Sequence, residues 1–142
     1  MSTAILWPTF ALVALIFAVV MTMASRRFAH IRSTKPKREN FATSVAQKAY
    51  FSPIDSAAHN LANLFEMPVL FFALVPLLAI FHRAGHIQIA LAWLFVAMRA
   101  LHSFIHVTDR PALARFRAYL ASCVVLGTMW IGFAIDMLGA GA

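Results

Sequence analysis

Two groups of strongly polar side chains recur at helical spacing inside apolar stretches of the sequence. The first group is His59, Asn63 and Glu66, and the second is Arg99, His102 and His106. The spacings i, i+4, i+7 and i, i+3, i+7 place each group on a single helical face. Ionisable groups in hydrocarbon are costly, and they usually face a bundle interior, a partner or a water-filled cavity. The two groups therefore predict one polar site built between helices.

The composition predicts the elements that must hold such a site. Of the 142 residues 62% are hydrophobic and only 12% are charged, which is rare in a soluble domain. The apolar residues form four continuous blocks, each close to the roughly 20 residues that cross a bilayer. We therefore expect an all-α integral membrane protein, a four-transmembrane-helix bundle forming one domain over residues 1–142. The expected helices cover approximately 4–24, 56–81, 87–107 and 112–138.

The net charge of +7 is unevenly distributed. Seven of the twelve Lys and Arg residues lie between Arg26 and Lys48, and three more, Arg110, Arg115 and Arg117, surround the third connection. This asymmetry is the positive-inside pattern, which predicts both termini outside and the first and third connections in the cytoplasm. A basic segment beside a span is explained by topology and by attraction to anionic lipid in the bilayer. We therefore expect no nucleic-acid partner.

The connections carry signals of their own. The first helix is predicted to end near Ala24, followed by a basic loop over 25–55. The later part of this loop is either a short interfacial helix or an ordered loop. Pro68 and Pro76 interrupt the second apolar block and are predicted to bend that span.

Depth in the membrane brings the polar groups together. The second helix enters from the cytoplasm, so its polar group lies in its first three turns, whereas the polar group of the third helix lies in its last three turns. Arg115 and Tyr119 open the fourth helix on the same side. With a rise of about 1.5 Å per residue, all these side chains fall within a slab roughly 10–15 Å deep.

Simpler roles for these residues remain open. Glu66 and Arg99 can form a structural ion pair, contact a ligand, or do both. His102 and His106 are one turn apart, which suits a metal or haem, but no thiolate or second acidic cluster accompanies them. We therefore expect no metal site.

Two segments carry a resemblance to a known family. The stretch from Asn63 to Phe71, with Asn-x-x-Glu, and the stretch from Arg99 to His106, with Arg-x-x-His, resemble the MAPEG family, the membrane-associated proteins of eicosanoid and glutathione metabolism. The similarity continues through Arg115 and Tyr119.

The resemblance implies a trimer of four-helix bundles that binds glutathione between neighbouring subunits near the cytoplasmic face. The positions that match its glutathione contacts are Arg27, Asn63, Glu66, His102 and Tyr119. Arg115 matches the arginine that is thought to stabilise the glutathione thiolate.

Three positions depart from the family pattern. His59 stands where better-known members carry an arginine, and His106 stands where several carry a tyrosine. Phe116 replaces a serine of some synthases. The resemblance therefore does not extend to eicosanoid synthase activity.

The residue chemistry suits glutathione, which carries two carboxylates, an ammonium group and a thiol. Arg27, Arg99 and Arg115 can pair with carboxylate or thiolate. Glu66 can receive the ammonium group, and Asn63 can bond a peptide group. A neighbouring guanidinium favours the thiolate form of a thiol.

Three functional hypotheses follow from the sequence. The first is a glutathione transferase or peroxidase that uses Arg115 for the thiol and takes a hydrophobic small-molecule substrate from the bilayer. Its glutathione would also contact His59, Arg99 and His106. The second is a non-catalytic binding or scaffold protein of the same fold, and the third is a haem- or quinone-linked membrane protein. The expected location is a bacterial inner membrane.

Overall fold

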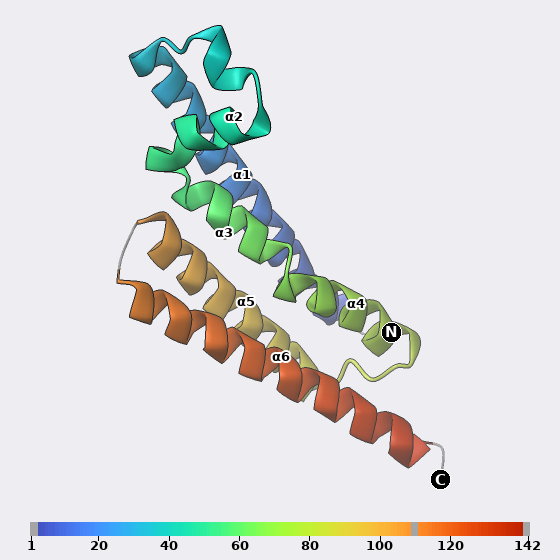
Figure 1. The fold of residues 1–142 in the computed structure, drawn as a ribbon. Helices are drawn as coiled ribbons and strands as arrows, with labels where there is room; N and C mark the ends of the chain where they lie inside the picture. Colours follow the sequence, from blue (N-terminus) through green and yellow to red (C-terminus); the bar gives the residue numbers. More distant parts are fainter. Residues whose placement is uncertain (1–2, 109–110, 141–142) are drawn as a thin grey trace.

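The computed structural model describes residues 3–108 and 111–140, and it confirms the predicted fold class. These residues form helices and turns without any strand. Four helical stretches are long and apolar enough to span a membrane: Thr3–Thr34, Ser56–Ile80, His86–Val107 and Ala112–Gly139. They pack as an elongated bundle in which the first helix begins and the last one ends at the same end (Figure 1). Asp109 and Arg110, in the third connection, lie outside the described residues.

Helix α1, Leu6–Thr34, follows a single 3-10 turn, Thr3–Ile5, and extends ten residues beyond the predicted end near Ala24. The apolar run stops near Ala24, but the next ten residues contain no glycine or proline and include three arginines and an alanine, which favour a helix, so the helix continues past the hydrocarbon. It ends where Lys35 takes a left-handed conformation, with φ 45°, immediately before Pro36. Proline disfavours a helical conformation in the residue that precedes it. Hydropathy therefore predicted the part of the helix that spans the membrane but not the residue at which the helix ends.

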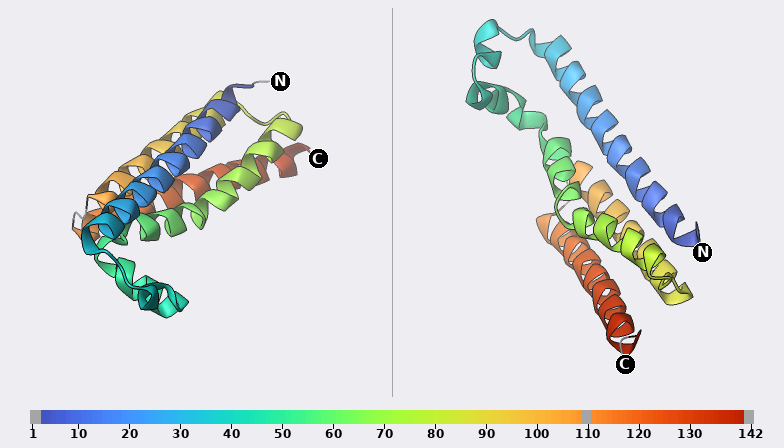
Figure 2. Two further views of the ribbon diagram at one scale, coloured as in Figure 1. Left: turned by 90° about the horizontal axis from the view of Figure 1, so that it is seen from above. Right: turned by 90° about the vertical axis from the view of Figure 1, so that its right-hand side faces the viewer.

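The first connection is largely helical. It contains a 3-10 turn, Arg38–Phe41, the short helix α2, Ser44–Phe51, and a second 3-10 turn, Ser52–Ile54. The Thr43 side chain accepts a hydrogen bond from the backbone N–H of Ala46 at 3.1 Å and so caps the start of α2. Of the two alternatives for this stretch, the short helix is thus the observed one. Together with the last turns of α1, the first connection projects beyond the end of α5 and the start of α6 (Figure 2).

The second span is divided into α3, Ser56–Leu64, and α4, Met67–Ile80. The break falls directly before Pro68, which confirms the bend predicted there, because proline lacks an N–H and its ring clashes with the carbonyl four residues back. The backbone N–H of Phe65 turns to the carbonyl of Ala62, and no backbone N–H from the following turn reaches the carbonyl of Asn63. Pro76, by contrast, lies inside α4, which continues through it.

Helices α5, His86–Val107, and α6, Ala112–Ala140, lie side by side (Figure 1). The side chain of Gln88 is buried between them and donates from Nε2 to the carbonyl oxygen of Met129 at 3.1 Å. A β-carbon on Gly132 would lie 3.1 Å from the same nitrogen. A larger residue at this position would therefore press on the Gln88 amide and disturb its hydrogen bond to Met129.

Buried residues divide the bundle into two halves. The half that holds the start of α1 and most of α4 has an apolar core that includes Leu12, Phe71 and Phe95, the two phenylalanine rings stacking with centroids 4.9 Å apart. The half nearer α2 buries polar side chains instead. Many large apolar side chains, among them Trp7 and Phe17, are exposed on the outer surface, as expected for a surface in contact with lipid.

Candidate functional site

The polar half of the bundle is built by α3, α5 and α6. Five polar side chains are buried where these helices meet: Asn60, Arg99, His102, Ser103 and His106. Ser103 donates a hydrogen bond to Oδ1 of Asn60 at 3.2 Å and so links α5 to α3. Sequence reasoning missed this pair. Both residues lie one turn along the faces that it had singled out, Asn60 before Asn63 and Ser103 after Arg99.

Arg99 is fully buried, and its main contact is a backbone carbonyl. Its Nη2 donates to the carbonyl oxygen of Asn63 at 2.7 Å, the oxygen that the break between α3 and α4 leaves outside the helical ladder. A cation at the C-terminal end of a helix is also favoured by the helix dipole. The guanidinium carbon lies 5.7 Å from the centre of the Tyr119 ring. Arg99 therefore holds the end of α3 against α5 and lies against α6.

The structure does not contain the buried ion pair between Glu66 and Arg99 that was one of the alternatives. Glu66 is exposed, and within the described ranges Arg99 forms no salt bridge. Two nitrogens of Arg99, Nε and Nη1, also have no hydrogen-bond partner in the described part of the chain. The carboxylate of Glu66 is thus left accessible to a ligand.

His102 links the third span to the start of the fourth. Its Nδ1 lies 3.1 Å from the carbonyl oxygen of Arg115, and because a carbonyl only accepts, Nδ1 is the donor. The His102 ring lies 5.8 Å from that of Tyr119 and 5.7 Å from that of His106, measured between centroids. The histidine therefore fixes the backbone that carries Arg115 and leaves the Arg115 side chain available.

A cavity of about 330 Å³ brings four of the predicted site residues together. Its walls are Asn63, His102, Ala112, Arg115, Phe116 and Tyr119, contributed by α3, α5 and α6. Arg115 supplies a cation, Tyr119 a hydroxyl group, and Asn63 an amide that can both donate and accept. This set can hold a polar molecule with at least one anionic group.

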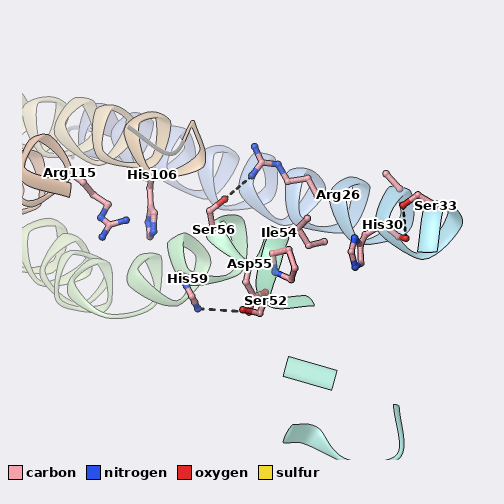
Figure 3. A pocket seen from close by; sticks show the side chains of 12 residues that line it. Arg26, His30, Ser33, Ser52, Ile54, Asp55, Ser56, His59, His106 and Arg115 are labelled. Atoms are coloured by element: carbon pink, nitrogen blue, oxygen red, sulfur yellow. Dashed lines mark hydrogen bonds and ion pairs between the residues drawn. The ribbon is translucent and has the colours of Figure 1, made fainter. Parts of the chain in front are cut away.

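A second, larger cavity of about 820 Å³ also has Arg115 in its wall. His59, His106 and Arg115 line it together with residues from α1 and from the turn before α3 (Figure 3). At its wall Arg26 donates at 2.8 Å both to Oγ of Ser56 and to the carbonyl oxygen of Val107. Arg26 thereby joins α1, α3 and the end of α5, a role that sequence reasoning did not assign to it.

Arg27 and His59 gather around a different residue, Asp55. The guanidinium of Arg27 lies 3.2 Å from one Asp55 carboxylate oxygen, and Nε2 of His59 lies 3.9 Å from the other. Arg27 also lies over the Phe51 ring, 4.7 Å from its centre. Arg27 does not line the cavity that contains Tyr119, whereas His59 reaches the larger cavity. Within the ranges 3–108 and 111–140, no group of three or more His, Cys, Asp or Glu residues could hold a metal ion.

The fold and the polar half of the bundle define a multi-pass membrane protein with four helical spans and a polar site between them. A model of the MAPEG family matches residues 5–135, nearly the whole chain. The protein therefore belongs to the MAPEG family, as the resemblance had predicted. A search of curated proteins and a search of solved structures each gave no match.

Proposed function

We propose that this MAPEG protein is a glutathione-dependent transferase or peroxidase that acts on hydrophobic electrophiles. The observation that carries the proposal is the joint placement of Asn63, His102, Arg115 and Tyr119 around one cavity. These side chains come from three helices, and they provide the cation, the amide and the hydroxyl group that a thiol-containing peptide requires.

The remaining predicted contacts would complete the site from exposed positions. Glu66 is exposed, and 70% of the His59 side chain is accessible, so both can meet the ammonium and carboxylate groups of glutathione. Arg27 keeps one third of its side chain accessible beside Asp55 and can meet a ligand held by a neighbouring subunit. We infer a trimer in which glutathione lies between subunits, each chain forming one domain over residues 1–142.

Arg115 would act on the thiol. A guanidinium beside the sulfur stabilises the thiolate relative to the thiol, and each unit of pKa is worth about 1.4 kcal/mol. The thiolate sulfur then attacks the electrophilic carbon, a C–S bond forms, and the leaving group departs with the bonding electron pair. With a hydroperoxide, the thiolate sulfur attacks the terminal oxygen and the O–O bond breaks, which gives a sulfenic acid and an alkoxide that takes a proton from water to become an alcohol. A second glutathione then reduces the sulfenic acid to a disulfide and water.

The position of the site suits a substrate that dissolves in the bilayer. The polar half of the bundle is the half next to the basic first connection, for which the positive-inside pattern predicts a cytoplasmic location. Glutathione would enter from water on that side, while the apolar substrate would arrive laterally from lipid. We place the protein in a bacterial inner membrane with both termini outside.

A second candidate function, a non-catalytic binding or scaffold protein, is favoured by the contacts of Arg99. This residue bonds the carbonyl of Asn63, and the neighbouring Asn60–Ser103 pair joins the same two helices. Both contacts hold the bundle together without any ligand. In this alternative Arg115 has no chemical role, so its removal leaves every measured activity unchanged.

Calorimetric titration of glutathione into the purified full-length protein in detergent tests the proposal. Glu66→Ala is expected to weaken binding, because it removes the partner of the ammonium group. Arg115→Ala is expected to leave affinity within about threefold and to lower the transferase rate with a chlorodinitrobenzene probe about tenfold at neutral pH, the effect of one pKa unit on the thiol. Circular dichroism confirms folding of each variant.

Arg117→Ala is the matched control, since Arg117 is an exposed arginine two positions from Arg115 on the same helix. It should bind glutathione and react as the wild type does. No saturable binding at millimolar glutathione in folded protein would reject the proposal. Equal rates for Arg115→Ala and wild type, with binding intact, would remove Arg115 from the chemistry and favour the scaffold.

A further inference from the structure

Two further cavities flank α2 where it packs on the end of α1. The first, of about 330 Å³, has almost entirely apolar walls. Its apolar side chains are Met23, Ala24, Phe28, Ile31, Phe41 and Phe51. Phe28 and Phe41 are themselves exposed, so one side of this cavity is open to the surroundings of the bundle. We call it the apolar slot.

The second cavity, of about 470 Å³, also lies beside α2 and has several charged side chains in its walls. Lys48, Asp55 and His59 line it, and Arg27 belongs to the walls of both cavities. Because Arg27 pairs with Asp55, those two charges offset each other. Lys48 forms no salt bridge with any residue of the described ranges, so its charge is not balanced within the subunit. We call this cavity the cationic mouth.

The depth of the two cavities matches the structure of a lipid monolayer. Met23 and Ala24 lie where the apolar run of the first span ends, so the apolar slot begins at the edge of the hydrocarbon. The cationic mouth adjoins the slot at Arg27, and its other walls come from the basic connection and the start of α3. A molecule that fits both cavities has an apolar chain and an anionic group at one end.

We propose that the slot and the mouth together form a binding site for an anionic phospholipid of the adjacent leaflet. One acyl chain would lie in the apolar slot against Phe28 and Phe51, and the second chain would remain in the bilayer through the open side. The phosphate group would contact Lys48 and the nitrogens of Arg27 that Asp55 does not use. The site shares Arg27 and His59 with the proposed glutathione contacts, but Lys48 and Ala24, the residues varied below, belong to the lipid site alone.

Native mass spectrometry of the purified full-length protein tests this site. The protein is titrated in detergent with phosphatidylglycerol, phosphatidylcholine of the same chains, and oleate. Wild type is expected to bind phosphatidylglycerol about fivefold more tightly than phosphatidylcholine, the preference that one basic residue near a membrane surface provides. Lys48→Gln should abolish this preference, and Ala24→Trp, which fills the slot, should weaken the binding of both phospholipids.

Lys37→Gln is the matched control, because it removes the same charge from the same connection and Lys37 lines neither cavity. It should keep the fivefold preference. Equal loss in Lys37→Gln and Lys48→Gln would overturn the proposal in favour of diffuse surface charge. Retention of oleate without phosphatidylglycerol would also overturn it, by making the occupant a free acid. Unchanged phospholipid binding in folded Ala24→Trp would exclude the slot as the chain site.

Discussion

Removal of the Arg26 guanidinium tests how the polar half of the bundle is held together. Its two donated hydrogen bonds, to Ser56 and to the carbonyl of Val107, are both 2.8 Å long. A hydrogen bond from a charged donor contributes about 1.5–3 kcal/mol, and partial exposure reduces this to about 1 kcal/mol for each bond here. Arg26→Met is therefore expected to destabilise the protein by about 2 kcal/mol, or about 6 °C in Tm for a chain of this size.

The assay is thermal unfolding in one detergent, followed by circular dichroism, across a series of variants. Arg26→Lys should fall between wild type and Arg26→Met, because a single ammonium group cannot span both acceptors as the guanidinium fork does. Ser56→Ala should cost about 1 kcal/mol. In the Arg26→Met background, however, Ser56→Ala should cost almost nothing, since its partner is already absent.

Arg32→Met provides the control, since Arg32 is exposed on the same helix and its replacement removes the same charge. Its Tm should stay within about 2 °C of wild type. Equal losses for Arg26→Met and Arg32→Met would show that the effect is one of overall charge. Additive losses for Arg26→Met and Ser56→Ala would show that the two side chains do not interact. Either result would refute the reasoning.

Three further changes give results that unfolding measurements can check. Gly132→Val should lower Tm by several degrees because its side chain meets Gln88 Nε2, whereas Gly127→Val, with nothing within 4 Å of its β-carbon position, should not. Pro68→Ala should lower Tm, although alanine is the better helix former. A straight helix would bond the Asn63 carbonyl within its own backbone and leave the buried Arg99 guanidinium without this acceptor. A rise in Tm would contradict this prediction. Ser103→Ala should cost about 1 kcal/mol in the free energy of unfolding, since the buried amide of its partner on α3 loses a hydrogen bond, and no change would rule out that link.

Hydropathy was sufficient to predict the four spans, because a bilayer imposes the length and composition of any helix that crosses it. It did not predict that α1 reaches Thr34, since helix formation in water beyond the hydrocarbon depends on propensity and on the stop at Lys35 and Pro36. The break before Pro68 could be predicted from the missing N–H of proline.

The site was predictable only in part. Helical spacing and matching depth selected Asn63, His102, Arg115 and Tyr119, which do line one cavity. The partner of Arg99 could not be predicted, because a backbone carbonyl has no residue type and becomes an acceptor only where the helix breaks. Arg27, His59 and Glu66 stay predictions as glutathione ligands. In particular, the pairing of Arg27 and His59 with Asp55 depends on how the first connection folds back on α1.

The bond between Arg99 and the carbonyl of Asn63 also has a consequence for biogenesis. A lone arginine near the middle of a span is costly to transfer into lipid, and an unpaired carbonyl on α3 is costly as well. Each group satisfies the other only when both spans are in the membrane and side by side. The second and third spans should therefore enter the bilayer as one hairpin, joined by the short turn between Ile80 and His86. In a truncated chain that ends before α5, the second span would have to enter the bilayer with the Asn63 carbonyl unpaired, because Arg99 is absent.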